Sequence, residues 1–240
     1  MYVTPGATRS TAYEGDIQTK LETLKWSYLF AQLNENRLIG LAKLATWCHL
    51  RKGDFVFREG DRSDFFYFLK AGRIKLFKES ICGKNFTISV LQPGDAVHSV
   101  VLFDDMPRWA SAKAIDEVIA MRIGGEEFFA FASENPSVLI GLTNILAGEV
   151  QRAYDRIRDM VVDRVDQRLI KIINMLTCKF GMTLFFTAEE IAELAGTTTE
   201  TTCRVLSRLK RSGVIGSSRR KIIVLDQPRL NMLRDDFRID

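Results

Sequence analysis

The chain has 240 residues, 46% of them hydrophobic, so it is long enough for one large domain or two ordinary domains with packed cores. No stretch approaches the ~20 uninterrupted apolar residues of a membrane span, and no basic-then-apolar signal segment opens the chain, which predicts a cytoplasmic protein without a membrane partner. The net charge of +4 is uneven, because residues 164–240 hold 14 Lys and Arg against 9 Asp and Glu. A basic C-terminal part is typical of a module that binds nucleic-acid phosphates.

The N-terminal half is predicted to contain two short helices followed by a compact β domain. Residues 1–20 lack periodicity and are expected to form an arm, whereas residues 21–45 carry apolar residues at helical spacing. From His49 on, short alternating runs are separated by turn signals about 7 to 12 residues apart, which favours an antiparallel barrel or sandwich. The predicted strands include 55–57, 65–70, 74–78, 87–91, 110–114 and 118–123.

A long helix is predicted to begin at Pro136. Apolar residues recur along it at alternating four- and three-residue steps with charged residues beside them, which is the pattern of a two-stranded coiled coil. The alternative is that this stripe packs only on its own β domain. We expect a homodimer, because a two-fold dimer presents paired DNA-binding helices to a palindromic site. The predicted seam consists of Leu139, Leu142, Leu146, Val150, Ala153, Ile157 and Met160.

Residues 187–215 predict two helices joined by a tight turn. The pairs Thr187–Glu190 and Thr197–Glu200 have the spacing of capping boxes that start helices, and Gly196 would end the first helix. The second helix, to about residue 211, has one apolar face and an opposite face of polar and cationic groups. This arrangement is typical of a helix-turn-helix whose second helix enters the DNA major groove.

Residues 213–218 and 219–225 are predicted to form a β-hairpin, which would complete a winged helix. No acidic residue occurs between Glu200 and Asp226, so the second helix and the hairpin are both basic. In an ordinary surface helix pair, Glu200 and Arg204 would instead make only an ion pair along the helix. We expect double-stranded DNA as the partner, with base contacts from the helix and phosphate contacts from the hairpin. The predicted DNA-binding residues are Thr198, Thr199, Glu200, Thr201, Arg204, Arg208, Arg219 and Arg220.

Four cysteines, Cys48, Cys82, Cys178 and Cys203, are scattered without a Cys-x-x-Cys pair. Their spacing suits neither a zinc site nor an iron–sulfur cluster, and a cytoplasmic protein rarely keeps disulfides, so we predict free thiols and no metal site. Cys203 lies on the face of the second helix that is predicted to meet DNA, where oxidation would weaken binding.

In this order, the predicted elements resemble the superfamily of the cyclic-AMP receptor protein and the fumarate–nitrate reduction regulator (CRP/FNR), which are bacterial transcription regulators. The resemblance covers residues 28–228 and rests on glycines at the turns, on the long helix, on the winged helix and on the run Phe68-Leu69-Lys70-Ala71-Gly72-Arg73-Ile74-Lys75. It implies an α+β fold with a cupin-like, cyclic-nucleotide-binding-like β-roll sensor and a C-terminal winged helix-turn-helix. The corresponding parts are an arm at 1–27, a sensor at 28–130, a dimerisation helix at 131–164 and a DNA-binding domain at 165–240.

The resemblance also implies roles for particular residues. Family members read bases with a Glu and an Arg spaced as Glu200 and Arg204 are. Many members carry an Arg immediately before that Glu, where this chain has Thr199, so we expect a different half-site. A small effector would control DNA binding, and RNA polymerase would be a partner if the protein activates transcription.

The effector pocket of the family corresponds to Gly94, Asp95, His98, Arg108, Trp109 and Ala110. Members that bind cyclic nucleotides carry Gly-Glu and later Arg-Ser-Ala or Arg-Thr-Ala, so Asp95 and Trp109 depart from that pattern. Because an indole is far larger than a hydroxymethyl group, Trp109 is expected to close the pocket or to stack on a flat ligand. We therefore predict that the protein does not use cyclic AMP.

The effector and cofactor are otherwise left open by the sequence. His98 resembles the haem-ligand region of the family's carbon-monoxide sensor, so haem is one alternative, and a cyclic nucleotide, another metabolite or no effector are the others. The family's cysteine-ligated oxygen sensor is excluded, because the chain has no N-terminal cysteine cluster.

Two other functional classes compete with a DNA-binding regulator. Enzyme activity is not predicted, because the chain has no nucleophile elbow, P-loop or metal-binding His pair and only two histidines. A cyclic-nucleotide-binding signalling subunit that acts through a protein partner would share the β-roll. Such a subunit has no need for a basic winged helix.

Overall fold

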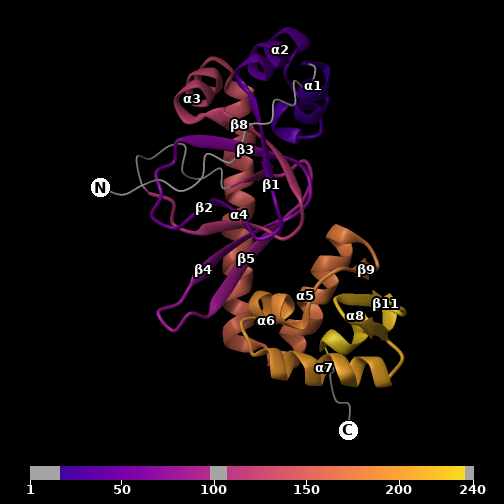
Figure 1. Ribbon diagram of the computed structural model, residues 1–240. Coiled ribbons are helices and arrows are strands. Elements are labelled where there is room, and N and C mark those ends of the chain that lie inside the picture. The colour runs from indigo at the N-terminus through magenta and orange to yellow at the C-terminus, as the bar shows by residue number, and fades with distance from the viewer. Residues whose placement is uncertain (1–16, 98–106, 236–240) are drawn as a thin grey trace. The chain divides into compact units, whose positions relative to one another are not determined.

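The computed structural model describes residues 17–97 and 107–235, and the statements below refer to those residues (Figure 1). They divide into two compact units, one formed by the chain up to residue 78 with residues 88–150, the other by residues 79–87 with the chain from 151 onward. No helix in the described part of the chain is long and apolar enough to cross a membrane.

The first unit begins with three short helices and continues as a β domain that ends in two helices. The helices are α1 (Ile17–Lys25), η1 (Tyr28–Phe30), α2 (Glu35–Leu44), α3 (Gly125–Glu134) and α4 (Pro136–Val162), the last of which continues into the second unit. The strands are β1 (Thr46–Leu50), β2 (Phe55–Phe57), β3 (Phe65–Ala71), β4 (Ile74–Glu79), β5 (Asn85–Leu91), β6 (Ala96–Val97), β7 (Ser111–Ala114) and β8 (Val118–Gly124). Helix α1 begins inside the segment that was predicted to be an arm, because Leu21 and Leu24 share a helix face and are buried in the core.

The strands form two antiparallel sheets, in the orders β1-β8-β3-β6 and β2-β7-β4-β5. Successive side chains of a strand point to opposite faces of the sheet, so the side chains of β3 pack into two different apolar clusters. Tyr67 and Leu69 join the apolar cluster that both sheets share, whereas Phe66 and Phe68 join the cluster formed with the helices. Phe66 stacks on Phe128 of α3 with ring centroids 4.0 Å apart. The structure is a β-roll with a helical cover, which confirms the predicted fold of the N-terminal part.

The turn between β3 and β4 requires glycine at residue 72, within the run 68–75 on which the family resemblance rests. Gly72 has a φ of 82°, and a Cβ there would lie 2.2 Å from the backbone oxygen of Glu117. Next to it, Arg73 donates to both carboxylate oxygens of Asp116 at 2.6 and 3.0 Å. These contacts tie the β3–β4 turn to the β7–β8 turn.

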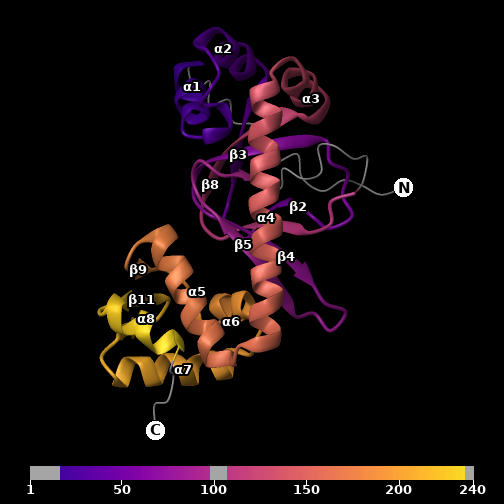
Figure 2. The same ribbon diagram turned by 180° about the vertical axis from the view of Figure 1, so that it is seen from behind.

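The second unit contains the end of α4 followed by a winged helix-turn-helix (Figure 2). Its elements are α5 (Val165–Phe180), β9 (Thr183–Leu184), α6 (Ala188–Ala195), α7 (Thr199–Arg211), β10 (Ile215–Ser218), β11 (Lys221–Val224) and α8 (Gln227–Asp235). The three strands pair in the order β10-β11-β9. The predicted helix pair and hairpin are confirmed, and β9 and α8 are additional elements that were not predicted from the sequence.

Candidate nucleic-acid interface

The first helix of the motif, α6, begins and ends as its sequence predicts. Thr187 Oγ1 accepts a hydrogen bond from the backbone N–H of Glu190 at 3.1 Å, and Glu190 Oε2 accepts one from the N–H of Thr187 at 2.6 Å. At the other end, Gly196 adopts the left-handed conformation with a φ of 62°. The N–H groups of Gly196 and Thr197 both turn back to the oxygen of Ala192.

The second helix, α7, begins one residue later than predicted. Thr198, and not Thr197, is the N-cap, and its Oγ1 accepts from the N–H of Thr201 at 3.2 Å. The physical reason is that the N–H of Thr197 is still bonded to Ala192 of α6, so residue 197 belongs to the turn. The hydroxyl of Thr202 donates to the oxygen of Thr198 at 3.0 Å and is fully buried.

The two faces of α7 separate as the pattern predicts. Thr202, Val205, Leu206 and Leu209 are buried. Thr198, Thr199, Glu200, Cys203 and Arg204 are exposed, while Thr201 and Arg208 are half-buried.

Glu200 and Arg204 do not pair with each other, unlike in the alternative in which they make only an ion pair along the helix. Among the residues that the structure describes, no ion pair joins these two side chains, although they lie four residues apart. Arg204 Nη2 instead lies 3.5 Å from the hydroxyl of Thr201. A carboxylate and a guanidinium are therefore exposed side by side on one face and can each make hydrogen bonds to a partner.

The wing is a tight hairpin with two arginines at its tip. Ser218 of β10 pairs with Lys221 of β11, so Arg219 and Arg220 form the two-residue turn between them, and both are exposed. Arg220 has a φ of 60°, the single positive value of a non-glycine residue in the described ranges. Such turns favour Gly, and an L-residue with a side chain is strained there, so Arg220 departs from the local preference at a residue predicted to bind phosphate. At the base of the wing, Lys210 Nζ of α7 donates to the oxygen of Ser217 at 3.1 Å, a tie that was not predicted from the sequence.

This strain gives a testable prediction. We expect Arg220→Gly to weaken DNA binding and to reduce the dependence of log K on log salt by about one, because the wing tip then neutralises one phosphate fewer. The free energy of unfolding should not fall, because relief of the left-handed strain offsets the entropy cost of glycine, each about 1 kcal/mol. The control is Arg219→Gly at a residue without positive φ, which should lose both affinity and stability. Chemical denaturation and binding over a salt series measure the two effects, and a clear loss of stability in Arg220→Gly would contradict the strain argument.

Three of the predicted effector residues, Gly94, Asp95 and Arg108, make hydrogen bonds within the protein. The N–H of Gly94 donates to the oxygen of Leu69 at 2.8 Å, and Asp95 Oδ2 accepts from the N–H of Gln92 at 3.0 Å. Arg108 is 3% exposed, and its Nη2 donates to the oxygen of Phe65 at 2.5 Å.

The guanidinium of Arg108 lies 4.2 Å from the centroid of the Phe57 ring. Burial lowers the pKa of Arg108, and the nearby Tyr67 and Asp64 oppose that change.

Trp109 does not fill the interior of the roll. Its side chain is 39% exposed, with Lys78 Nζ 6.0 Å from the ring, whereas Arg108 and Ala110 on either side are buried. Trp109 and Ala110 form a bend that precedes β7, so Trp109 is not part of the alternating pattern of a strand. Trp109 is therefore not packed in the buried core of the roll, and its role at the effector pocket stays a prediction. His98, the candidate haem ligand, lies outside the described residues.

The apolar stripe of α4 differs from the predicted seam in its N-terminal part. Leu142 is 1% exposed and, with the partly buried Leu139, packs in the helical core of its own sensor, so neither supplies a free surface. Leu146 is half-buried. Val150, Ala153, Ile157 and Met160 are exposed, as a seam requires. Large apolar residues are exposed on one face of α4, and we call them the α4 stripe. They are Ile140, Val150, Tyr154, Ile157 and Val161.

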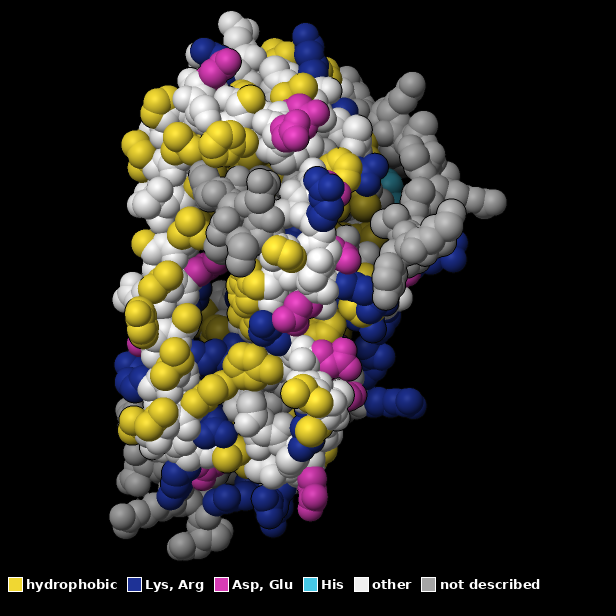
Figure 3. All heavy atoms as spheres, turned by 90° about the vertical axis from the view of Figure 1, so that its left-hand side faces the viewer, with side chains coloured by type: hydrophobic (Ala, Val, Ile, Leu, Met, Phe, Trp, Pro, Cys, Tyr) yellow, Lys and Arg dark blue, Asp and Glu magenta, His cyan; other side chains and the backbone are white. Residues whose placement is uncertain are grey.

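Figure 3 shows hydrophobic side chains gathered along the outward side of α4, at the left of the view. Tyr154 is 70% exposed and Val161 is 80% exposed. Neither was predicted to lie in the seam, because three- and four-residue steps counted from Leu139 pass through Ala153 and Met160 instead. The signal was present, since Thr143 and Ala147 continue the spacing from Ile140 to Val150 with small residues.

Comparisons with known proteins agree with this architecture. A family model described as a cyclic nucleotide-binding domain matches residues 47–135, and one described as a Crp-like helix-turn-helix domain matches residues 167–233. The chain belongs to the CRP/FNR superfamily of transcription regulators. The helix-turn-helix match covers the elements that a signalling subunit would not need.

Relatives in this superfamily match two thirds or more of the chain. The CRP-like cAMP-activated global transcriptional regulator of Mycobacterium tuberculosis is 25% identical over 217 residues, which cover 87% of this chain and 97% of the relative. The cyclic AMP receptor protein of Thermus thermophilus is 27% identical over 165 residues, with coverage of 68% and 76%. The solved structure of FixK2 from Bradyrhizobium japonicum has a TM-score of 0.71 at 22% identity and covers 79% of this chain and 96% of its own, which shows the shared CRP/FNR fold.

Proposed function

We propose that this CRP/FNR regulator acts as a cytoplasmic homodimer that binds a palindromic DNA site with α7 and the wing of each subunit. The observation that carries the proposal is the exposed, mutually unpaired Glu200 and Arg204 on α7. A guanidinium makes two hydrogen bonds to the O6 and N7 atoms of guanine, and a carboxylate accepts one from the N4 amino group of cytosine. Together the two side chains can read adjacent bases in the major groove.

Residues around this pair are suited to backbone contacts. Arg219 and Arg220 at the wing tip are exposed cations on a short hairpin, and Arg208 lies on the same face of α7 as Arg204. The exposed hydroxyl of Thr199 near the helix N-terminus can donate to a phosphate oxygen, where the helix dipole also favours an anion, whereas the hydroxyl of Thr198 donates to Thr201 Oγ1 at 3.0 Å. These contacts would fix the register of α7 without adding sequence preference.

The α4 stripe supports the homodimer. Five large apolar side chains exposed at coiled-coil spacing on one helix are the usual surface of a two-stranded interface, and a two-fold pair would give two reading helices for two half-sites. If the protein activates transcription, RNA polymerase is its further protein partner.

Selection of binding sites from random duplexes by the purified full-length protein tests this function. The expected result is a palindromic consensus whose half-sites lie about one DNA turn apart, bound by a dimer. A protein that is dimeric but selects no sequence would favour the alternative, a signalling subunit that acts through a protein partner.

For the effector, we propose that the β-roll does not bind cyclic AMP. In Arg108 and Asp95, which correspond to the ligand-holding residues of the family, Nη2 and Oδ2 are already bonded to Phe65 and Gln92. A ligand phosphate would have to share the guanidinium with the oxygen of Phe65 or displace that bond, which lies in a buried site where its loss is costly.

We expect calorimetry to detect no binding of cyclic AMP or cyclic GMP at micromolar concentrations. Trp109→Ser should behave in the same way, because the indole lies at the surface. The cAMP-activated relative from Mycobacterium tuberculosis is the positive control. Micromolar binding by the wild type would refute the proposal, and binding by Trp109→Ser alone would show that Trp109 is the block. The visible absorption spectrum of the purified protein tests haem as the alternative.

A further inference from the structure

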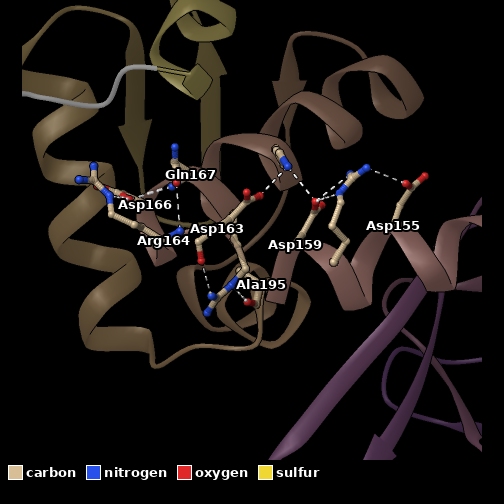
Figure 4. A network of polar contacts seen from close by, with 10 residues as sticks. Asp155, Asp159, Asp163, Arg164, Asp166, Gln167 and Ala195 are labelled. Carbon is tan, nitrogen blue, oxygen red and sulfur yellow. Dashed lines mark hydrogen bonds and ion pairs between the residues drawn. The ribbon is translucent and has the colours of Figure 1, made fainter. Parts of the chain in front are cut away.

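Arg168 of α5 holds the last carbonyl of α6. Its Nε donates to the backbone oxygen of Ala195 at 3.2 Å, and its Nη1 donates to the backbone oxygen of Asp163 at 3.1 Å (Figure 4). Ala195 is the last residue of α6, and Asp163 directly follows the last residue of α4. A single guanidinium therefore joins the ends of two helices.

Arg156 of α4 holds the preceding carbonyl. Its Nη2 donates to the backbone oxygen of Leu194, and it also donates to the oxygen of Thr87 at 2.7 Å. The guanidinium lies 4.3 Å from the centroid of the Phe86 ring. Burial lowers the pKa of Arg156 to about 10, so the side chain is still protonated at neutral pH.

Both arginines act at the end of the helix where cations are most effective. The last carbonyls of a helix have no partner within it and form the negative end of its dipole. In α6, the turn that follows uses the oxygen of Ala192, to which the N–H groups of Gly196 and Thr197 both donate. The oxygens of Leu194 and Ala195 are thus left to the two guanidinium groups.

Other contacts make the base of this arrangement rigid. Lys171 of α5 binds Asp159 at 2.8 Å and Asp163 at 2.5 Å, and all three side chains are mostly buried. On α6 itself, Glu193 accepts hydrogen bonds from Asn85 Nδ2 at 3.1 Å and from Thr87 Oγ1 at 2.8 Å. Helices α4, α5 and α6 and the hairpin tip at residues 79–87 are therefore tied together by charged groups within one compact unit.

We propose that Arg156 and Arg168 form a clamp on the last turn of α6 that sets the position of the α6–α7 turn. Because α7 follows that turn after only three residues, the clamp orients the helix that is proposed to read DNA. Both arginines are positioning residues, and neither is needed as a contact to a base or phosphate. The inference rests on the proposed function of α7 and adds the residues that hold it in place.

The test compares Arg156→Met and Arg168→Met with wild type in the full-length protein. Methionine keeps much of the apolar stem and removes the donors. We expect each variant to bind the selected palindrome roughly tenfold more weakly, while affinity for an unrelated duplex, the salt slope and the dimer are unchanged. A phosphate-binding arginine would instead lower the salt slope and weaken binding to every duplex.

Arg158→Met is the matched control, because Arg158 lies two residues from Arg156 on α4 and pairs only with Asp155 and Asp159 among the described residues. It should keep the wild-type ratio of specific to unrelated binding. Arg156→Lys and Arg168→Lys should recover part of that ratio, since an ammonium can still bond one carbonyl.

Hydrogen exchange of the backbone amides at residues 196–198, measured on the protein without DNA, tests whether the clamp stabilises the α6–α7 turn. Exchange should be faster in both methionine variants than in wild type, at a temperature where all remain folded. Wild-type exchange together with a wild-type binding ratio would overturn the clamp. A wild-type protein that selects no DNA would refute the proposed function instead, and faster exchange in the variants would still support the clamp.

Discussion

Ile157→Asp is expected to be monomeric and to lose specific DNA binding. Ile157 lies in the middle of the α4 stripe and is 58% exposed in the single subunit, so the aspartate itself does not disturb the folded chain. In a dimer the same carboxylate would be desolvated opposite its own copy without a partner, which costs several kcal/mol. A monomer offers one reading helix instead of two, and the affinity gained by binding two half-sites together is lost.

Sedimentation equilibrium and binding to the selected palindrome measure this effect. Arg152→Asp is the matched control, because Arg152 is exposed on the side of α4 away from the stripe and should leave the dimer intact. Leu146 is less suitable for this test, since it is half-buried in its own subunit and a charge there would also affect folding. A dimeric Ile157→Asp protein would place the interface elsewhere.

Arg204→Ala is expected to weaken binding by about 1–3 kcal/mol per half-site and to relax the preference at one base position. In a homodimer the substitution acts twice, so the total loss is about 2–6 kcal/mol for independent half-sites. Glu200→Ala should relax a neighbouring position, because its carboxylate lies one turn before Arg204 on the same face. Repeating the site selection with each variant identifies the affected position.

The control for base reading is Arg219→Ala at the wing. That variant should bind all sequences more weakly by the same factor, and its salt slope should fall by about one for each phosphate that it no longer neutralises. Uniform weakening in Arg204→Ala would show that Arg204 binds a phosphate. An unchanged consensus with Glu200→Ala would remove the major-groove model for α7.

The motif that carries DNA binding could be predicted from sequence because its determinants are local. Thr187 with Glu190, and Gly196 after the last apolar residue, act over three or four residues, and the structure forms both contacts. The start of α7 could not be placed, because two threonines in succession can cap and the choice was made by a hydrogen bond from Thr197 to Ala192. Turn geometry decided between them.

The sensor and the long helix depend on contacts between distant residues, and there prediction was less complete. The strands of the β-roll were found from alternation, but the exposure of Trp109 follows a bend at residues 109–110, which alternation does not show. The periodicity of α4 showed an apolar stripe but not which residues the sensor would cover. Leu142 packs on the subunit's own helices, and the free surface lies on the face that contains Tyr154.

If the α4 stripe forms the proposed dimer interface, it would also tie the amount of active regulator to the amount of protein in the cell. A helix with Tyr154 and Val161 largely in water is stabilised by association, and the dimer population follows mass action. At low copy number, occupancy of a palindromic site would then rise with more than the first power of protein concentration. A modest change in synthesis or degradation would thereby produce a steeper change in transcription, independently of any ligand.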